Sequence, residues 1–114
     1  MGRTIIIQGD AVAIAFLNVK IPLADSGQYA QYKMSKKDRL IFTLGRKHRH
    51  PLLVKRYPRD FLDESGNSFV VQLTPEETAR LPCLLYEVNL TIDIEGKGKE
   101  VYTLINQELE VVAK

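Results

Sequence analysis

The residues with the clearest capacity for chemistry form a basic run near the middle of the chain. Its members are Arg46, Lys47, His48, Arg49 and His50, and Lys55, Arg56 and Arg59 follow. Such cations can contact phosphate groups. The aromatic residues around the run do not alternate with it as a base-stacking platform requires. The pattern therefore favours a solvated loop, or a rim that meets an acidic partner protein, and makes nucleic-acid binding unlikely.

Metal and thiol chemistry have weaker support in the sequence. His48 and His50 would point the same way on an extended strand, but a zinc site needs three or four ligands. No Cys, Asp or Glu lies nearby in sequence, so we expect no metal site. Cys83 stands between a proline and two leucines, and we expect an inert, packed thiol.

Patterns typical of enzymes are missing from the sequence. The stretch 96–99 (Gly-Lys-Gly-Lys) lacks the spacing, the Ser or Thr and the following helix of a phosphate loop, so it predicts a turn. Paired carboxylates, a Ser–His arrangement and a nucleophile elbow cannot be identified. We therefore expect a protein that is not an enzyme, with no catalytic residue and no cofactor.

Length and composition predict one globular domain covering residues 1–114. The chain is 45% hydrophobic and 26% charged, with a net charge of +2 that does not by itself imply a polyanionic partner. Its single cysteine excludes an internal disulfide. No apolar run approaches the roughly 20 residues of a membrane span, so we expect no membrane partner and folding in a reducing cytoplasm.

The chain is organised around residues 67–94, which predict a strand, a short helix and a second strand. Residues 69, 71 and 73 share one apolar face. Thr74, Pro75 and Glu77 carry the signals of a capped helix start, and Pro82 limits the helical turn to residues 75–80. From Tyr86 to residue 94, apolar and polar side chains alternate as in a half-buried strand.

The remaining strands are bounded by turn residues. Short strands are expected at 4–7, 11–19, 40–44 and 52–57, and the last of these begins at Pro51 and suits a sheet edge. Alternate alanines at 11, 13 and 15 also permit a helix, but the flanking turn residues favour a strand. Residues 25–27, 35–38 and 63–67 predict turns, and residues 21–37 are otherwise hard to interpret.

The C-terminal part predicts a hairpin whose second strand has two possible phases. A turn at 95–99 leads into a strand from residue 100. Odd positions from Val101 to Val111 could face the core, whereas Tyr102 and Leu104 favour the opposite phase. A bulge near Asn106 would reconcile them, and the pattern leaves the phase open.

About seven short strands with one helical turn predict an all-β fold. The arrangement that this pattern favours is an immunoglobulin-like antiparallel β-sandwich with Greek-key connections.

Several segments, in order and over nearly the whole chain, match one family pattern. The matched residues are Gly9-Asp10, Val12, Ile14, Phe16, Tyr32, Met34, Ser35, Asp38, Leu40, Phe42, Leu73-Thr74-Pro75-Glu76, Thr78, Leu81-Pro82, Tyr86, Val88, Leu90, Gly98 and Tyr102-Thr103-Leu104. In these the chain resembles the small immunoglobulin-like proteins of tail and baseplate gene clusters in phages and prophages of Gram-positive bacteria. Those proteins are similar to the N-terminal domain of phage upper baseplate proteins.

The resemblance implies a structural protein of a phage or prophage tail or baseplate, whose partners are other tail or baseplate subunits, and it allows a homo-oligomer. It implies synthesis in the bacterial cytoplasm and a place in the virion. Leu84 and Leu85 stand where the family usually has Gly-Lys or Gly-Arg, and they indicate an apolar contact. Asn106-Gln107 stand where it often has a glycine. The matched residues are structural, so no catalytic role carries over.

The expected interface residues are therefore exposed surface positions. They are Arg46, Lys47, His48, Arg49, His50, Leu84 and Leu85, together with the edge strand at 52–57. The alternative function is a carbohydrate-binding module for the host cell wall, with Tyr29, Tyr32 and Tyr57 as stacking residues. A weaker alternative is an intracellular nucleic-acid-binding factor that uses the basic run.

Overall fold

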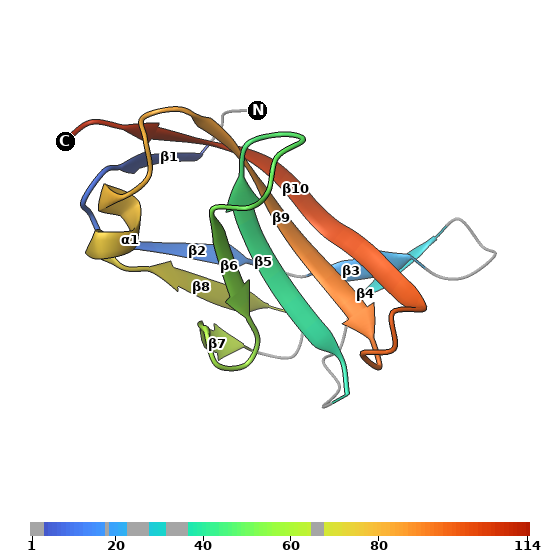
Figure 1. Cartoon of the computed structure of the whole chain (residues 1–114). Coiled ribbons are helices and arrows are strands. Elements are labelled where there is room, and N and C mark those ends of the chain that lie inside the picture. Colours follow the sequence, from blue (N-terminus) through green and yellow to red (C-terminus); the bar gives the residue numbers. More distant parts are fainter. Residues whose placement is uncertain (1–3, 18, 23–27, 32–36, 65–67) are drawn as a thin grey trace.

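The computed structural model describes residues 4–17, 19–22, 28–31, 37–64 and 68–114 (Figure 1). These residues form an all-β structure with one short helix. The strands are β1 (Thr4–Ile7), β2 (Val12–Phe16), β3 (Lys20–Pro22), β4 (Tyr29–Gln31), β5 (Arg39–Gly45), β6 (Leu53–Arg56), β7 (Phe61–Glu64), β8 (Phe69–Leu73), β9 (Leu85–Ile94) and β10 (Glu100–Val112), and the helix is α1 (Pro75–Ala79).

The strands form three sheets. One has five strands in the order β1-β10-β9-β5-β6, the second has the order β2-β8-β7, and β3 and β4 form a separate hairpin (Figure 1). Paired strands run antiparallel except β1, which runs parallel to β10. The five-stranded and three-stranded sheets contribute to one hydrophobic core, so they pack against each other as two layers.

The core is built by strict alternation along the central strands. On β9, Tyr86, Val88, Leu90 and Ile92 are buried while the residues between them are half-buried. On β8, Phe69, Val71 and Leu73 are fully buried. Since successive side chains of a strand point to opposite faces, the apolar row predicted from residue 86 does face the core.

All seven strands expected from the sequence are present, together with three shorter ones, β3, β4 and β7. The apolar run after Gly9 is a strand and not a helix, and it ends at Phe16. The turn expected at 63–67 is wrong for its first two positions, which belong to β7. The turn at 25–27, the first half of the one at 35–38 and residues 65–67 of the third lie outside the described residues.

Helix α1 begins and ends where its sequence signals place it. Thr74 Oγ1 accepts a hydrogen bond from the Glu77 N–H (3.1 Å), and Glu77 Oε1 accepts one from the Thr74 N–H (2.9 Å). This reciprocal pair is a capping box, with Pro75 at the first helical turn. The helix ends at Ala79, one residue before the expected limit, with Arg80 as its C-cap.

Thr78 ties this helix to the turn between β1 and β2. It is the only buried polar residue in the described part of the chain. Its hydroxyl donates to the Asp10 carbonyl (2.8 Å) and accepts from the Gly9 N–H (3.0 Å). Gln8 adds a bond from its side-chain amide to the Leu81 carbonyl (2.8 Å). These contacts fix one end of the sandwich, because they satisfy backbone groups that belong to no strand ladder.

The phase of β10 is resolved by a bulge that lies earlier than expected. Its pairing with β9 shifts between Thr103 and Ile105 and not at Asn106-Gln107. Before the shift, an even-numbered residue, Tyr102, is half-buried. After the shift, the odd-numbered residues Leu109 and Val111 are buried. Both expected phases therefore occur, one on each side of the bulge.

Tyr86 closes the connection between α1 and β9. Its hydroxyl donates to the Pro82 carbonyl at 2.6 Å, and burial of the ring raises its pKa above the ordinary value. A tyrosine near the start of this strand that bonds to upstream backbone is a feature of immunoglobulin-like sandwiches. It supports the immunoglobulin-like assignment, which stays a prediction.

We expect Tyr86→Phe to lower the free energy of unfolding by about 1–2 kcal/mol, because the Pro82 carbonyl loses its donor. Urea denaturation measures this change. Tyr102→Phe on the half-buried part of β10 is the control, and it should have a smaller effect. Equal effects of the two substitutions would contradict the assigned role.

An ion pair joins β6 to α1. Lys55 Nζ lies 2.6 Å from Glu77 Oε2, and both side chains are largely shielded from water. Burial raises the pKa of Glu77, but hydrogen bonds from Lys55 and from the Thr74 backbone outweigh it, and the net pKa is lowered. The charged form of Glu77 is therefore favoured in the folded state.

Because the folded-state pKa of Glu77 lies below its usual value of 4.5, its contribution to stability is present above that value. The contribution is lost as the pH falls through the folded-state pKa. We expect Glu77→Gln, which keeps the cap, to cost about 1 kcal/mol at pH 7 and much less near pH 3. Urea denaturation at both pH values tests this, with Glu76→Gln as the exposed control. A cost that does not change with pH would contradict the ion pair.

Candidate interaction surface

The predicted contact residues Leu84 and Leu85 lie on the surface at the start of β9. They are 39% and 42% exposed. The strand register places Leu85 beside Glu110 of β10 and Glu110 beside Ile5 of β1. Ile5 is 59% exposed, so this row lies on the outer face of the five-stranded sheet.

Ile7 and Val112 extend this row into an apolar patch. They pair across β1 and β10, and Ile7 is 41% exposed. We define the apolar patch as Ile5, Ile7, Leu85 and Val112, with Leu84 exposed beside it and Glu110 lying between Leu85 and Ile5. The sequence did not identify Ile5 and Ile7 as contact residues, because three consecutive isoleucines do not reveal which of them faces water. The signal appears only when β1 pairs with β10.

The basic loop, residues 46–50, connects β5 and β6, and all five residues are exposed. Its turn is held by a hydrogen bond from the Arg49 N–H to the Arg46 carbonyl (3.0 Å), and His48 adopts a positive φ of 63°. Gly45 precedes the loop, where a Cβ would lie 2.9 Å from the Pro51 backbone. The chain can return this closely because the residue is glycine. The expectation of a solvated loop is confirmed.

The structure brings the basic loop and the apolar patch to the same face. A hollow of about 320 Å³ is lined by Lys47 and Leu85 together with Tyr86, Glu87, Asn106 and Glu108. A smaller hollow of about 90 Å³ is lined by Arg46, His48 and Arg49 and again by Glu87. Glu87 and Glu108 are paired across β9 and β10. Apolar, acidic and basic groups therefore alternate across this end of the sheet.

Cys83 and the two histidines considered as metal ligands all lie at the surface. Cys83 is exposed and not packed, with its Sγ 3.7 Å from Gln8 Oε1. The expectation of a buried thiol is wrong because the connection from α1 to β9 runs over the surface, and its leucines point outward as well. His48 and His50 lie in the exposed loop, and no group of three or more ligand-type residues occurs in the described part of the chain.

The tyrosines proposed for carbohydrate stacking are not brought together. Tyr57 packs edge-on against Phe61 and Phe69, with ring centroids 5.7 and 6.0 Å away. Tyr29 is exposed on β4, in the separate hairpin. Tyr32 lies outside the described residues. Tyr57 therefore serves the core, and a shared stacking face is not formed by the two described tyrosines.

The predicted edge strand is confirmed as an edge. β6 ends the five-stranded sheet and pairs only with β5 among the described strands. Val54 is exposed on it, and Lys55 and Arg56 add two charges.

The chain was also compared with known proteins. Neither a scan against protein-family models nor a search of curated proteins finds a match. None of the described helical residues forms a helix long and apolar enough to cross a membrane. The tail-protein resemblance therefore remains an expectation from the sequence.

We expect the apolar patch to be dispensable for folding. Ile5→Thr and Leu85→Thr should each change the free energy of unfolding by less than about 1 kcal/mol, because both side chains are exposed in the monomer. Val88→Thr, which places a hydroxyl in the core three residues further along β9, should cost about 2 kcal/mol. Thermal or urea denaturation at low protein concentration measures all three. A large loss at Ile5 or Leu85 would mean that the patch serves the fold and not a partner.

Proposed function

We propose that this chain is a non-enzymatic assembly subunit of a phage or prophage tail or baseplate that acts through protein–protein contacts. The observation that carries the proposal is the apolar patch on the outer face of the five-stranded sheet, flanked by acidic residues and the basic loop. Neighbouring exposed apolar side chains on a soluble domain mark contact sites when polar residues rim them.

The charges around the patch suit recognition of a specific neighbour. Glu87 and Glu108 lie on one side of Leu85, and Lys47 lies across the same hollow. Charges at the rim of an interface set orientation and reject wrong partners, while the apolar centre supplies most of the affinity. The patch follows this division except at Glu110, which lies between Leu85 and Ile5.

The tail or baseplate setting comes from the sequence resemblance. The strand orders and the Tyr86–Pro82 hydrogen bond support the immunoglobulin-like sandwich that the resemblance implies. A carbohydrate-binding module has less support, because Tyr57 is engaged in the core and Tyr29 stands on a separate hairpin. A nucleic-acid-binding role would rest on the basic loop alone, beside which Glu87 places a negative charge.

The test is binding of the purified chain to the purified products of neighbouring tail and baseplate genes. We expect a stable complex with at least one of them, and Leu85→Lys should weaken it at least about tenfold by placing a charge in the apolar centre. Isothermal titration calorimetry or light scattering measures both effects. Val101→Lys is the matched control, because Val101 is also apolar and exposed but lies at the opposite end of β10.

Two results would contradict the proposal. One is the absence of binding to every tail or baseplate product from the gene cluster, with a gene neighbourhood that lacks such genes. The other is specific binding of cell-wall glycans by the monomer, which would favour the carbohydrate-binding alternative.

A further inference from the structure

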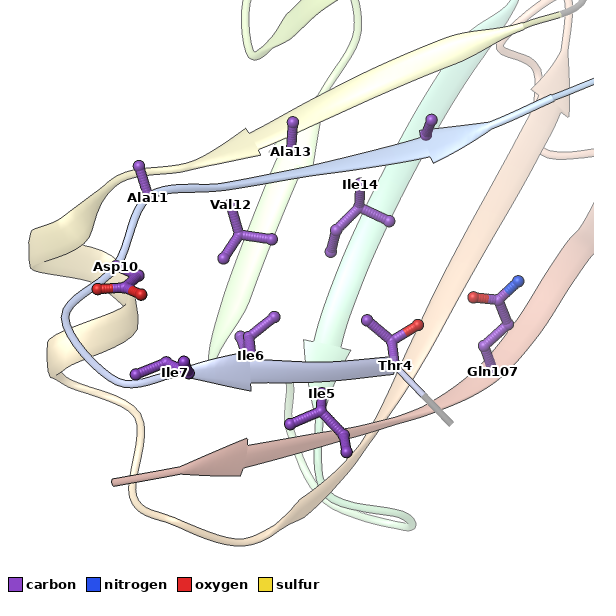
Figure 2. Close-up of a pocket in the computed structure, with 11 residues that line it drawn as sticks. Thr4, Ile5, Ile6, Ile7, Asp10, Ala11, Val12, Ala13, Ile14 and Gln107 are labelled. Carbon is purple, nitrogen blue, oxygen red and sulfur yellow. The ribbon is translucent and has the colours of Figure 1, made fainter. Parts of the chain in front are cut away.

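A wide hollow lies between β1 and β2 (Figure 2). It has a volume of about 620 Å³ and is lined by both strands, by Asp10 and by Gln107. β1 is the edge of the five-stranded sheet, and β2 is the edge of the three-stranded sheet. The hollow therefore lies at the side of the sandwich where β1 and β2 each have no further described strand beside them.

β2 leaves backbone hydrogen-bonding groups on this open side. It pairs with β8 from Val12–Leu73 to Phe16–Phe69, and no other described strand pairs with it. In an antiparallel strand, alternate residues direct their N–H and C=O groups toward opposite neighbours. One row of β2 groups therefore faces outward at the edge of its sheet, and the ligand that matches such a row is another extended backbone.

The open side differs from the opposite side in how its edges are guarded. The edge strand β6 on the opposite side carries Lys55 and Arg56. Charged residues on an edge prevent pairing with other chains. β2 has the sequence Val-Ala-Ile-Ala-Phe, without charge, proline or bulge. The contrast indicates that the β2 edge is kept available for pairing.

The sequence of β2 is close to symmetric about Ile14, and this symmetry identifies the partner. An antiparallel pair of two β2 strands centred on Ile14 places Ala13 opposite Ala15 of the second copy. Two residues further out on the same face, Leu17, which is exposed directly after β2, comes opposite Ala11. Small residues therefore face small residues at the centre, and each large exposed leucine meets an alanine.

We propose that the open edge of β2 binds the β2 edge of a second copy of this chain, in antiparallel register about Ile14. The pairing joins two three-stranded sheets into one six-stranded sheet across a twofold axis. Inward side chains of β2, namely Val12 and Ile14, point toward Ile6 of β1 (Figure 2), so pairing also shields the half-buried Val12. The side chains of Ala13 and Ala15 are small, so they face each other across the new strand pair without crowding.

The proposed β2 dimer rests on the proposed function, because both treat the chain as a subunit that assembles with other proteins. The apolar patch and the β2 edge are nevertheless separate surfaces. The apolar patch lies on the outer face of the five-stranded sheet, whereas β2 edges the other sheet. Leu85→Lys should leave the β2 dimer intact, and Ala13→Lys should leave binding by the apolar patch intact. The experiments therefore distinguish failure of the β2 dimer from failure of the proposed function.

Sedimentation equilibrium of the purified full chain tests the oligomeric state. We expect a dimer, and Ala13→Lys should raise its dissociation constant at least about tenfold, because it adds a charge beside the paired edge. Gln72→Lys is the matched control. Gln72 is the β8 partner of Ala13 in the same sheet and is also exposed, but it lies one strand away from the open edge. It should leave the constant unchanged within about twofold. Circular dichroism confirms that each variant is folded.

Disulfide cross-linking tests the register without relying on loss of binding. In a Cys83→Ser background, the variants Ala13→Cys and Ala15→Cys are oxidised separately and as a mixture. The mixture should form cross-linked dimer several-fold faster than either alone, since only residues 13 and 15 lie opposite each other, with Cα atoms about 4.5–5.5 Å apart. Three results would each overturn the proposal. The first is a wild-type chain that stays monomeric at about 0.5 mM, roughly 10⁶-fold above a nanomolar dissociation constant. The others are equal effects of Ala13→Lys and Gln72→Lys on the dissociation constant, and equal cross-linking rates for the mixture and the single variants.

Discussion

The whole architecture depends on the burial of one row of side chains on β9. Tyr86, Val88, Leu90 and Ile92 pack between the layers, and β9 is the strand that links β5 and β10 into one sheet. Each buried aliphatic side chain contributes roughly 1.5–3 kcal/mol of transfer free energy relative to water. The outer residues of the same strand are thereby held facing away from the core. Leu85 and Glu87 reach the surface because their neighbours are buried.

A second constraint acts at the end of the sandwich where α1 lies. The Thr78 hydroxyl bonds to the Asp10 carbonyl, and the Gln8 side chain bonds to the Leu81 carbonyl just after the helix, so both join this corner to the turn after β1. The Lys55–Glu77 ion pair joins the helix to the edge strand β6. These bonds hold the turn between β1 and β2 against the helix. The apolar patch and the open β2 edge therefore both depend on polar contacts made at this corner.

Local patterns predicted much of this structure. Alternation identified the strands at β8 and β9, and the signals at Thr74, Pro75 and Glu77 identified the helix. Three short strands were missed: β3 and β4 because three residues give too little periodicity, and β7 because Asp63 and Glu64 were assigned to a turn. The bulge in β10 was expected near Asn106 but lies near Leu104. Its position depends on pairing with β9, which no local pattern records.

The surfaces were harder to predict than the core for the same reason. The basic loop and Leu84-Leu85 were identified because each is continuous in sequence. Ile5 joins the patch only through the parallel pairing of β1 with β10, across more than a hundred residues. The open edges of β1 and β2 follow from sheet order alone. Predicting a contact site that is made from distant strands therefore requires the tertiary structure, whereas predicting the fold class does not.

The bulge in β10 has a consequence for how this chain can change in length. Thr103 pairs with Thr91 and Ile105 pairs with Leu90, so Leu104 is the one supernumerary residue in that ladder. Loss of that residue would leave an uninterrupted ladder whose inward and outward positions are unchanged on both sides. A single deletion elsewhere in the strand would instead turn part of it inside out. The irregular point is thus where natural variants of this chain can shorten the strand without reversing its faces.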